Sequence, residues 1–167
     1  MRKKLLFMLF IVGLIFTTSC GISANKQKKE TDEWALSGTY KDKDGRIFIG
    51  EKEKLSILLP SSGKFIKDTP DKYMWLFWGK EQELENKKLK VLAIQKDNEK
   101  QEPIFLQSND NPVKSTSPAG SLIVGKIHSA DAHLPTLMSF SQSGIWKLRV
   151  YIDKKLIDTL VINVKDK

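Results

Sequence analysis

Short apolar or alternating segments, separated by turn residues, follow one another along most of this chain. Each is shorter than an ordinary helix, and several alternate apolar and polar residues with the period of two that a half-buried strand requires. Gly, Pro, Asn and Asp cluster between the segments, as they do between antiparallel strands joined by hairpins. The pattern therefore predicts an all-β fold, an antiparallel β-sandwich, with strands at residues 34–40, 46–50, 54–59, 73–78, 89–95, 103–107, 121–128, 144–153 and 156–164.

Two segments depart from this pattern. Residues 80–88 can hold one helical turn, because several good helix formers lie there. Residues 108–120 are dense in Ser, Asn and Pro and are predicted to be a long loop.

The last two strands give the clearest fold signal and are predicted to form the closing hairpin of the sandwich. Lys147 and Arg149 alternate with the apolar residues of the first strand, so we expect them on the solvent face. The residues expected to complete the core are Trp146, Leu148, Val150 and Ile152 on the first strand and Ile157, Val161 and Val164 on the return.

The strand at residues 73–78 is apolar on both faces. Tyr73, Trp75 and Phe77 share one face, and three further large side chains share the other. Three large side chains can supply much of a sandwich core. Alternatively, Tyr73, Trp75 and Phe77 form an exposed binding platform, because flat aromatic rings can stack on sugars or anchor a protein partner.

The first twenty residues have the layout of an export signal. Three basic residues at positions 2–4 precede an uncharged apolar run over residues 5–16, and small residues follow up to Cys20. The run is too short for a comfortable transmembrane helix, which needs about 20 apolar residues. Cys20 is the only cysteine and lies where a lipoprotein signal places the residue that receives the lipid. The alternative is an ordinary secreted protein cleaved between residues 17 and 24, with Cys20 a bystander.

These features divide the chain into a signal peptide (1–19), a lipidated Cys20 with a flexible tether (20–33) and a β-sandwich domain (34–167). The tether is polar and cannot bury enough apolar surface to fold. We expect the mature protein on the extracytoplasmic face of the cell membrane, held by its lipid. Loss of the three basic residues at positions 2–4 lowers the formal charge from +8 to +5. This charge either favours anionic headgroups or wall polymers, or is simply a solvated surface.

Five motifs of the expected domain lie at residues 34–40, 44–50, 72–79, 130–135 and 143–151. Together they resemble those of a family of small predicted lipoproteins of Gram-positive, Bacillus-type bacteria, and the resemblance covers residues 34–164. That family is catalogued as a domain of unknown function, so the resemblance implies an immunoglobulin-like fold and an envelope location, and lends no activity.

The best constellation for chemistry is His128, Asp131 and His133. Two imidazoles and a carboxylate could bind zinc, which takes three protein ligands and a water at catalytic sites. On a straight strand, residues 128 and 133 point to opposite faces, so a bend near Ala130 would be required. The chain has no Gly-x-Ser-x-Gly elbow, no P-loop, no dinucleotide-binding glycine pattern and no Cys-x-x-Cys pair. We therefore expect ordinary hydrogen-bonded histidines, no catalytic residue and no cofactor.

Together these observations predict a membrane-anchored module that acts by binding an envelope protein or an anionic wall polymer, with no nucleic-acid partner. The alternatives are an envelope enzyme, or a lipoprotein that binds a metal or small ligand through the His128–His133 region.

Overall fold

The structure is a computed structural model, and it describes residues 32–107 and 113–167. The expected signal peptide, Cys20 and residues 21–31 of the expected tether lie outside the described residues. Within those two ranges, no helix has the length and apolar character needed to cross a membrane.

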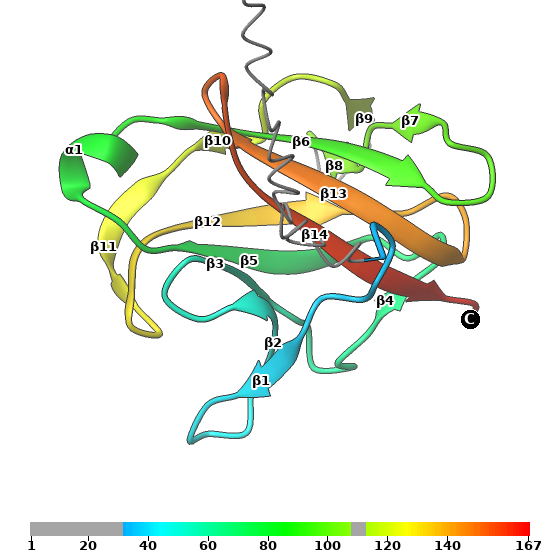
Figure 1. Cartoon of the computed structure of the whole chain (residues 1–167), viewed down its shortest axis with the longest axis horizontal. Coiled ribbons are helices and arrows are strands. Elements are labelled where there is room, and N and C mark those ends of the chain that lie inside the picture. The colour runs from blue at the N-terminus through cyan, green and yellow to red at the C-terminus, as the bar shows by residue number, and fades with distance from the viewer. Residues whose placement is uncertain (1–31, 108–112) are drawn as a thin grey trace, which may run out of the picture. The chain divides into compact units, whose positions relative to one another are not determined.

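Two β-sheets face each other (Figure 1), and this arrangement confirms the predicted all-β sandwich. The first sheet contains β1 (Thr39–Lys41), β2 (Ile47–Glu51), β3 (Leu55–Leu58), β5 (Asp71–Phe77), β12 (Ala130–Met138), β8 (Phe105–Leu106) and β9 (Lys114–Ser115) in that order, with β11 (Ile123–Ile127) paired to β12. The second contains β10 (Gly120–Ser121), β6 (Lys88–Gln95), β13 (Gly144–Ile152), β14 (Lys155–Lys165) and β4 (Phe65–Ile66), with β7 (Gln101–Glu102) paired to β6. Neighbouring strands are antiparallel except β4 and β14. The expected helical turn is α1 (Glu81–Leu84).

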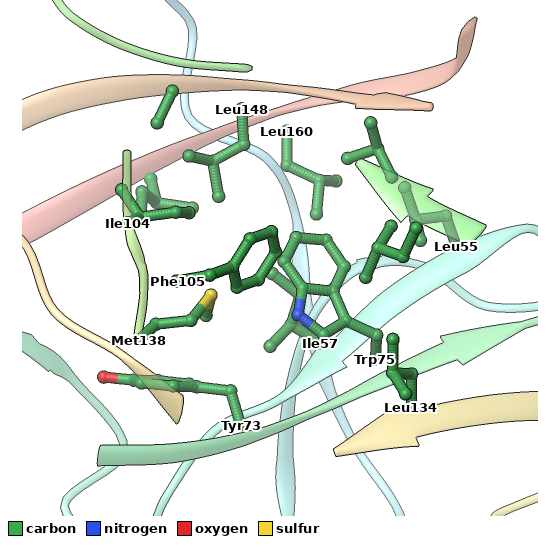
Figure 2. Close-up of a cluster of buried hydrophobic side chains, with 14 of the residues drawn as sticks. Leu55, Ile57, Tyr73, Trp75, Ile104, Phe105, Leu134, Met138, Leu148 and Leu160 are labelled. Atoms are coloured by element: carbon green, nitrogen blue, oxygen red, sulfur yellow. The ribbon is translucent and has the colours of Figure 1, made fainter. Parts of the chain in front are cut away.

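The main core lies between the sheets and is centred on Trp75, which is fully buried (Figure 2). Its indole N–H donates a hydrogen bond of 3.0 Å to the Thr136 hydroxyl on the neighbouring strand β12. The Phe105 ring meets the Trp75 ring edge to face, with 6.2 Å between centroids. The one polar atom of the Trp75 side chain is therefore satisfied without leaving the core.

The closing hairpin forms as predicted from β13 and β14, and the alternate residues of β13 from Trp146 onwards are buried in the main core. Two details differ from the sequence expectation. Val161 lies on the outer face of the second sheet, opposite Lys147, because the core positions of β14 are Leu160, Ile162 and Val164. Lys147 is only 3% exposed, since chain from outside the sheet covers it.

Strand β12 is a nine-residue strand that the sequence pattern did not predict, although it pairs with β5 along seven positions. Pro135 interrupts its sequence, and proline is rare inside sheets because it lacks an N–H. On the other side of β12, β11 pairs with residues 130–133 and β8 pairs with Met138. Among the described residues, Pro135 thus lies where that side of β12 has no strand partner, so its missing donor breaks no pairing.

Residues 32–38, here called the N-terminal segment, hold the two sheets together at one edge. The Ser37 N–H donates to the Val161 carbonyl of β14 at 2.9 Å, and the Val161 N–H returns a bond to the Ser37 hydroxyl at 2.8 Å. The Gly50 N–H of β2 donates to the Gly38 carbonyl at 2.9 Å. The segment therefore bonds to a strand of each sheet.

The same segment covers Lys147. The Lys147 ammonium lies 3.8 Å from the centroid of the Trp34 ring and forms an ion pair with Glu33. This ion pair lowers the pKa of the Glu33 carboxyl below its usual range. The expectation of a solvated Lys147 is therefore wrong, because a residue 113 positions earlier in the chain packs over it.

Candidate functional site

A second apolar cluster lies on the outer face of the first sheet. Phe48, Leu76 and Ala130 are buried there, outside the main core, and five partly buried side chains surround them. The outward face of β5 contributes to this cluster, so both faces of the aromatic strand are packed.

A cleft of about 360 Å³ opens beside this cluster, between the β1–β2 hairpin and the turn that joins β11 to β12. We call it the hairpin cleft, and it is lined by Tyr40, Lys41, Asp42, Lys43, Arg46, Phe48, Lys52, His128 and Ser129.

Aromatic rings form one wall of the hairpin cleft. The Tyr40 and Phe48 rings stack with centroids 4.9 Å apart, and the His128 ring meets Phe48 edge to face at 5.6 Å. The Tyr40 hydroxyl donates to the Ser56 hydroxyl at 3.0 Å. Burial raises the pKa of Tyr40, against the effect of that hydrogen bond, so this hydroxyl stays protonated at neutral pH.

The β1–β2 turn supplies the charge of the cleft. The Arg46 guanidinium donates to the Asp42 carboxylate at 2.6 Å and pairs also with Asp44. Since two carboxylates offset Arg46, the excess positive charge comes from the exposed lysines that also line the cleft, Lys41, Lys43 and Lys52.

His128 faces this charged turn, with Nδ1 3.9 Å from the Asp42 carboxylate. Burial lowers its pKa and Arg46 lowers it further, against the opposing effects of Asp42 and Asp44, so the ring is neutral at neutral pH. His128 and Ser129 form the two-residue turn with φ of 47° and 69°. Gly and Asn adopt this geometry more easily, so two larger polar side chains are present at some conformational cost.

The structure does not bring the three candidate metal ligands together. His128 faces the hairpin cleft, whereas Asp131 accepts a 3.0 Å bond from the Gly79 N–H and pairs with Lys126. The contact with Lys126 is the main reason why the pKa of Asp131 is lowered. His133 lies further along β12, and its Nδ1 is buried without a hydrogen-bond partner. In the described parts of the chain, no three His, Cys, Asp or Glu side chains are grouped as metal ligands.

The alternative interpretation, an exposed binding platform formed by Tyr73, Trp75 and Phe77, is wrong. Their exposed fractions are 2%, 0% and 1%, because this face of β5 points into the main core. Burial also raises the pKa of the Tyr73 hydroxyl. Of the two interpretations, core packing is therefore confirmed.

A larger hollow of about 640 Å³ lies between the β5–α1 connection and the β13–β14 turn. Two of its lysines are already paired, Lys54 with Asp158 at 3.0 Å and Lys87 with Asp153 at 3.5 Å. The hairpin cleft has the greater excess of cations over carboxylates in its lining, which makes it the better candidate for an anionic ligand.

Sequence reasoning missed the hairpin cleft, although a local signal was present. Residues 41–46 form a charged turn with two carboxylates and three cations between two short strands. Nothing in this signal indicates that the distant residues 128 and 129 would face the turn, because that contact depends on where the tertiary structure places the β11–β12 turn.

The described domain is thus an antiparallel β-sandwich with a small aromatic and basic cleft outside its core. The sequence pattern of a family described as a domain of unknown function (DUF4871) matches residues 25–162, and the chain belongs to that family. This confirms the resemblance noted in the sequence, and the family description names no activity.

A crystal structure of a predicted lipoprotein from Bacillus anthracis has a similar fold. The TM-score is 0.57 and the identity 22%, over 79% of this chain and 86% of the other. At this identity the similarity establishes the fold alone. No curated protein of known function matches the chain.

Proposed function

We propose that this protein is a lipoprotein held on the extracytoplasmic face of the membrane through Cys20, and that it acts by binding and not by catalysis. Three observations support the anchor: the basic start, the short apolar run and a single cysteine behind small residues. The fold is also shared with a predicted lipoprotein of Bacillus anthracis. Two acyl chains on one residue give stable attachment, whereas one gives only marginal binding.

The hairpin cleft is the observation that carries the binding proposal. The half-buried Tyr40 ring, stacked on the buried Phe48, offers a flat apolar surface, and the exposed lysines of the cleft offer positive charge. Aromatic and cationic groups together suit a ligand with both a flat or apolar part and an anionic group. The ligand class is therefore an anionic component of the envelope, either a wall polymer or an acidic segment of an envelope protein.

The anchor is tested by replacing Cys20 with Ala in the full chain. The expected result is an uncleaved precursor at this site and loss of metabolic lipid labelling. Wild-type protein that begins at another residue, or that carries no lipid, would refute the anchor.

The hairpin cleft is tested with a charge-reversed pair, Lys43→Glu with Lys52→Glu, and a matched pair outside the cleft, Lys64→Glu with Lys72→Glu. All four lysines are exposed, so both pairs make the same change in net charge. Each protein is titrated calorimetrically with a soluble poly(polyol phosphate) and is also used to capture cross-linked envelope partners. We expect the cleft pair alone to lose the interaction. Equal binding by both pairs would exclude the hairpin cleft as the site.

The metal alternative has a separate test. If His128, Asp131 and His133 were ligands, the purified protein would hold about one zinc or copper ion after dialysis, and His133→Ala would remove it. We expect no stoichiometric metal by elemental analysis and little effect of His133→Ala on folding. One metal ion per chain in the wild type, absent in the variant, would favour metal binding over the proposed binding of an anionic ligand.

A further inference from the structure

The outer face of the second sheet is strongly basic. The strand register places alternate residues of β6, β13 and β14 on this face. Within these three strands the outward positions include no Asp or Glu. We call the surface the basic face, and its exposed cations are Lys88, Lys90, Lys96, Arg149 and Lys165.

These five cations are available for an external partner. In the described part of the chain, none of them has a carboxylate within ion-pair distance. The buried Lys147 differs, because Glu33 pairs with it. Cations therefore outnumber carboxylates on the basic face, where Asp32 and Glu33 lie beside Arg149 and Asp153 lies beside Lys88.

Apolar side chains lie among the cations. Leu92, Ile94 and Tyr151 occupy outward positions and are partly exposed, and Leu156 on β14 is 49% exposed. Apolar side chains surrounded by Lys and Arg are typical of protein surfaces that bind at a membrane interface.

The chain enters the domain at this same face. Trp34 lies on Lys147 at the middle of the basic face, and the described chain begins two residues before Trp34. The eleven residues from Gly21 to Thr31 can span at most about 40 Å when fully extended. A lipid on Cys20 would therefore keep this face within that distance of the membrane.

We infer that the basic face docks on the anionic lipid headgroups of the membrane that carries the anchor. Electrostatic attraction in physiological salt acts over about 8 Å, so a short connection to the membrane is what makes it effective. Docking through this face would leave the hairpin cleft, on the outer face of the opposite sheet, directed toward the envelope. This docking rests on the proposed function in one respect, because the lipid anchor keeps the domain close to the membrane. The contact between the basic face and the headgroups itself requires no lipid on the protein.

The test uses the mature chain, residues 20–167, with Cys20→Ser and therefore no lipid. The fraction of protein that sediments with vesicles is measured at low and at physiological salt. Vesicles of phosphatidylglycerol and phosphatidylcholine are compared with vesicles of phosphatidylcholine alone. We expect binding only to the anionic vesicles, with affinity that falls as salt rises. Lys90→Glu with Arg149→Glu should weaken binding about tenfold or more. The matched pair Lys64→Glu with Lys72→Glu should retain most of it.

Circular dichroism and urea unfolding of each variant establish that the fold is intact. No binding to anionic vesicles, or equal weakening by the two charge-reversed pairs, would overturn the inference. Binding to a soluble poly(polyol phosphate) through Lys90 and Arg149, without vesicle binding, would also overturn it and assign the face to a wall polymer. The Cys20→Ala labelling and the Lys43 and Lys52 titrations test the proposed function separately, so the two failures are distinguishable.

Discussion

The contributions of Lys147 and Trp34 to the free energy of unfolding should be coupled, although the alternating sequence pattern of β13 predicts a solvent-facing Lys147. The ammonium lies 3.8 Å from the Trp34 ring centroid, and the Lys147 side chain is 4% exposed. A cation over an aromatic ring contributes about 0.5–1 kcal/mol when exposed and about 2 kcal/mol when desolvated. We therefore expect a coupling free energy of about 1–2 kcal/mol between the two side chains.

The coupling is measured with a double-mutant cycle of Trp34→Leu and Lys147→Met. Methionine keeps the length and apolar stem of the lysine while removing its charge, which limits the packing loss. The free energies of unfolding come from urea titrations of the mature, unlipidated chain, and the cycle isolates the pairwise contribution.

Lys96 provides a matched control, because its ammonium lies 6.0 Å from the centroid of the same Trp34 ring. The cycle of Trp34→Leu with Lys96→Met should give a clearly smaller coupling. If the Trp34 and Lys147 changes were additive within about 0.5 kcal/mol, the cation–π contact would contribute nothing measurable and the argument would fail.

Three further predictions concern stability. Trp146→Ala should cost about 3–5 kcal/mol because the ring is fully buried, while Arg149→Ala on the outer face should stay within about 0.5 kcal/mol; near-native urea stability of Trp146→Ala would contradict the core assignment. Gly50→Ala should cost about 2–4 kcal/mol, since φ is 118° and a Cβ would lie 2.4 Å from the Leu55 carbonyl oxygen, whereas Gly38→Ala, with open space around it, should be nearly neutral in the same assay. Because the pKa of His128 is lower in the folded chain than in the unfolded chain, the unfolded chain binds a proton at this residue more readily. The contribution of the neutral His128 to the unfolding free energy is therefore complete above about pH 6.5 and is lost as the pH falls. His128→Gln should flatten the decline in unfolding free energy between about pH 7 and pH 5, and an unchanged slope would refute this prediction.

The elements that the sequence predicts well are those whose pattern is local. The period of two around Trp146 identifies β13, its buried face and its hairpin partner without knowledge of the rest of the fold. Strand β12 alternates regularly in its burial, but Thr136 and Leu137 break the apolar–polar pattern, and Pro135 also argues against a strand when the sequence is considered alone. That proline is tolerated because β11 and β8 pair with different ends of β12, a fact of sheet topology that no local pattern contains.

The candidate site is less predictable because its parts are distant in sequence. The sequence groups His128 with its neighbours Asp131 and His133, yet its charged partner in the structure is Asp42. The aromatic side chains of Tyr73, Trp75 and Phe77 are compatible with either a core or a binding surface, and their burial assigns them to the core. In both cases the role of the residue depends on its three-dimensional partners, which the local sequence does not contain.

The bonds of the N-terminal segment to both sheets have a mechanical consequence. A lipid anchor on the membrane side and a bound ligand on the envelope side would pull the domain in opposite directions. Tension from the anchor would reach the fold first at Trp34 and Ser37, whose contacts with Lys147 and Val161 are few compared with the continuous pairing of β13 and β14. Detachment of this segment would lengthen the connection to the membrane while the sandwich stays folded, so the segment would act as a short mechanical extension that yields before the domain unfolds.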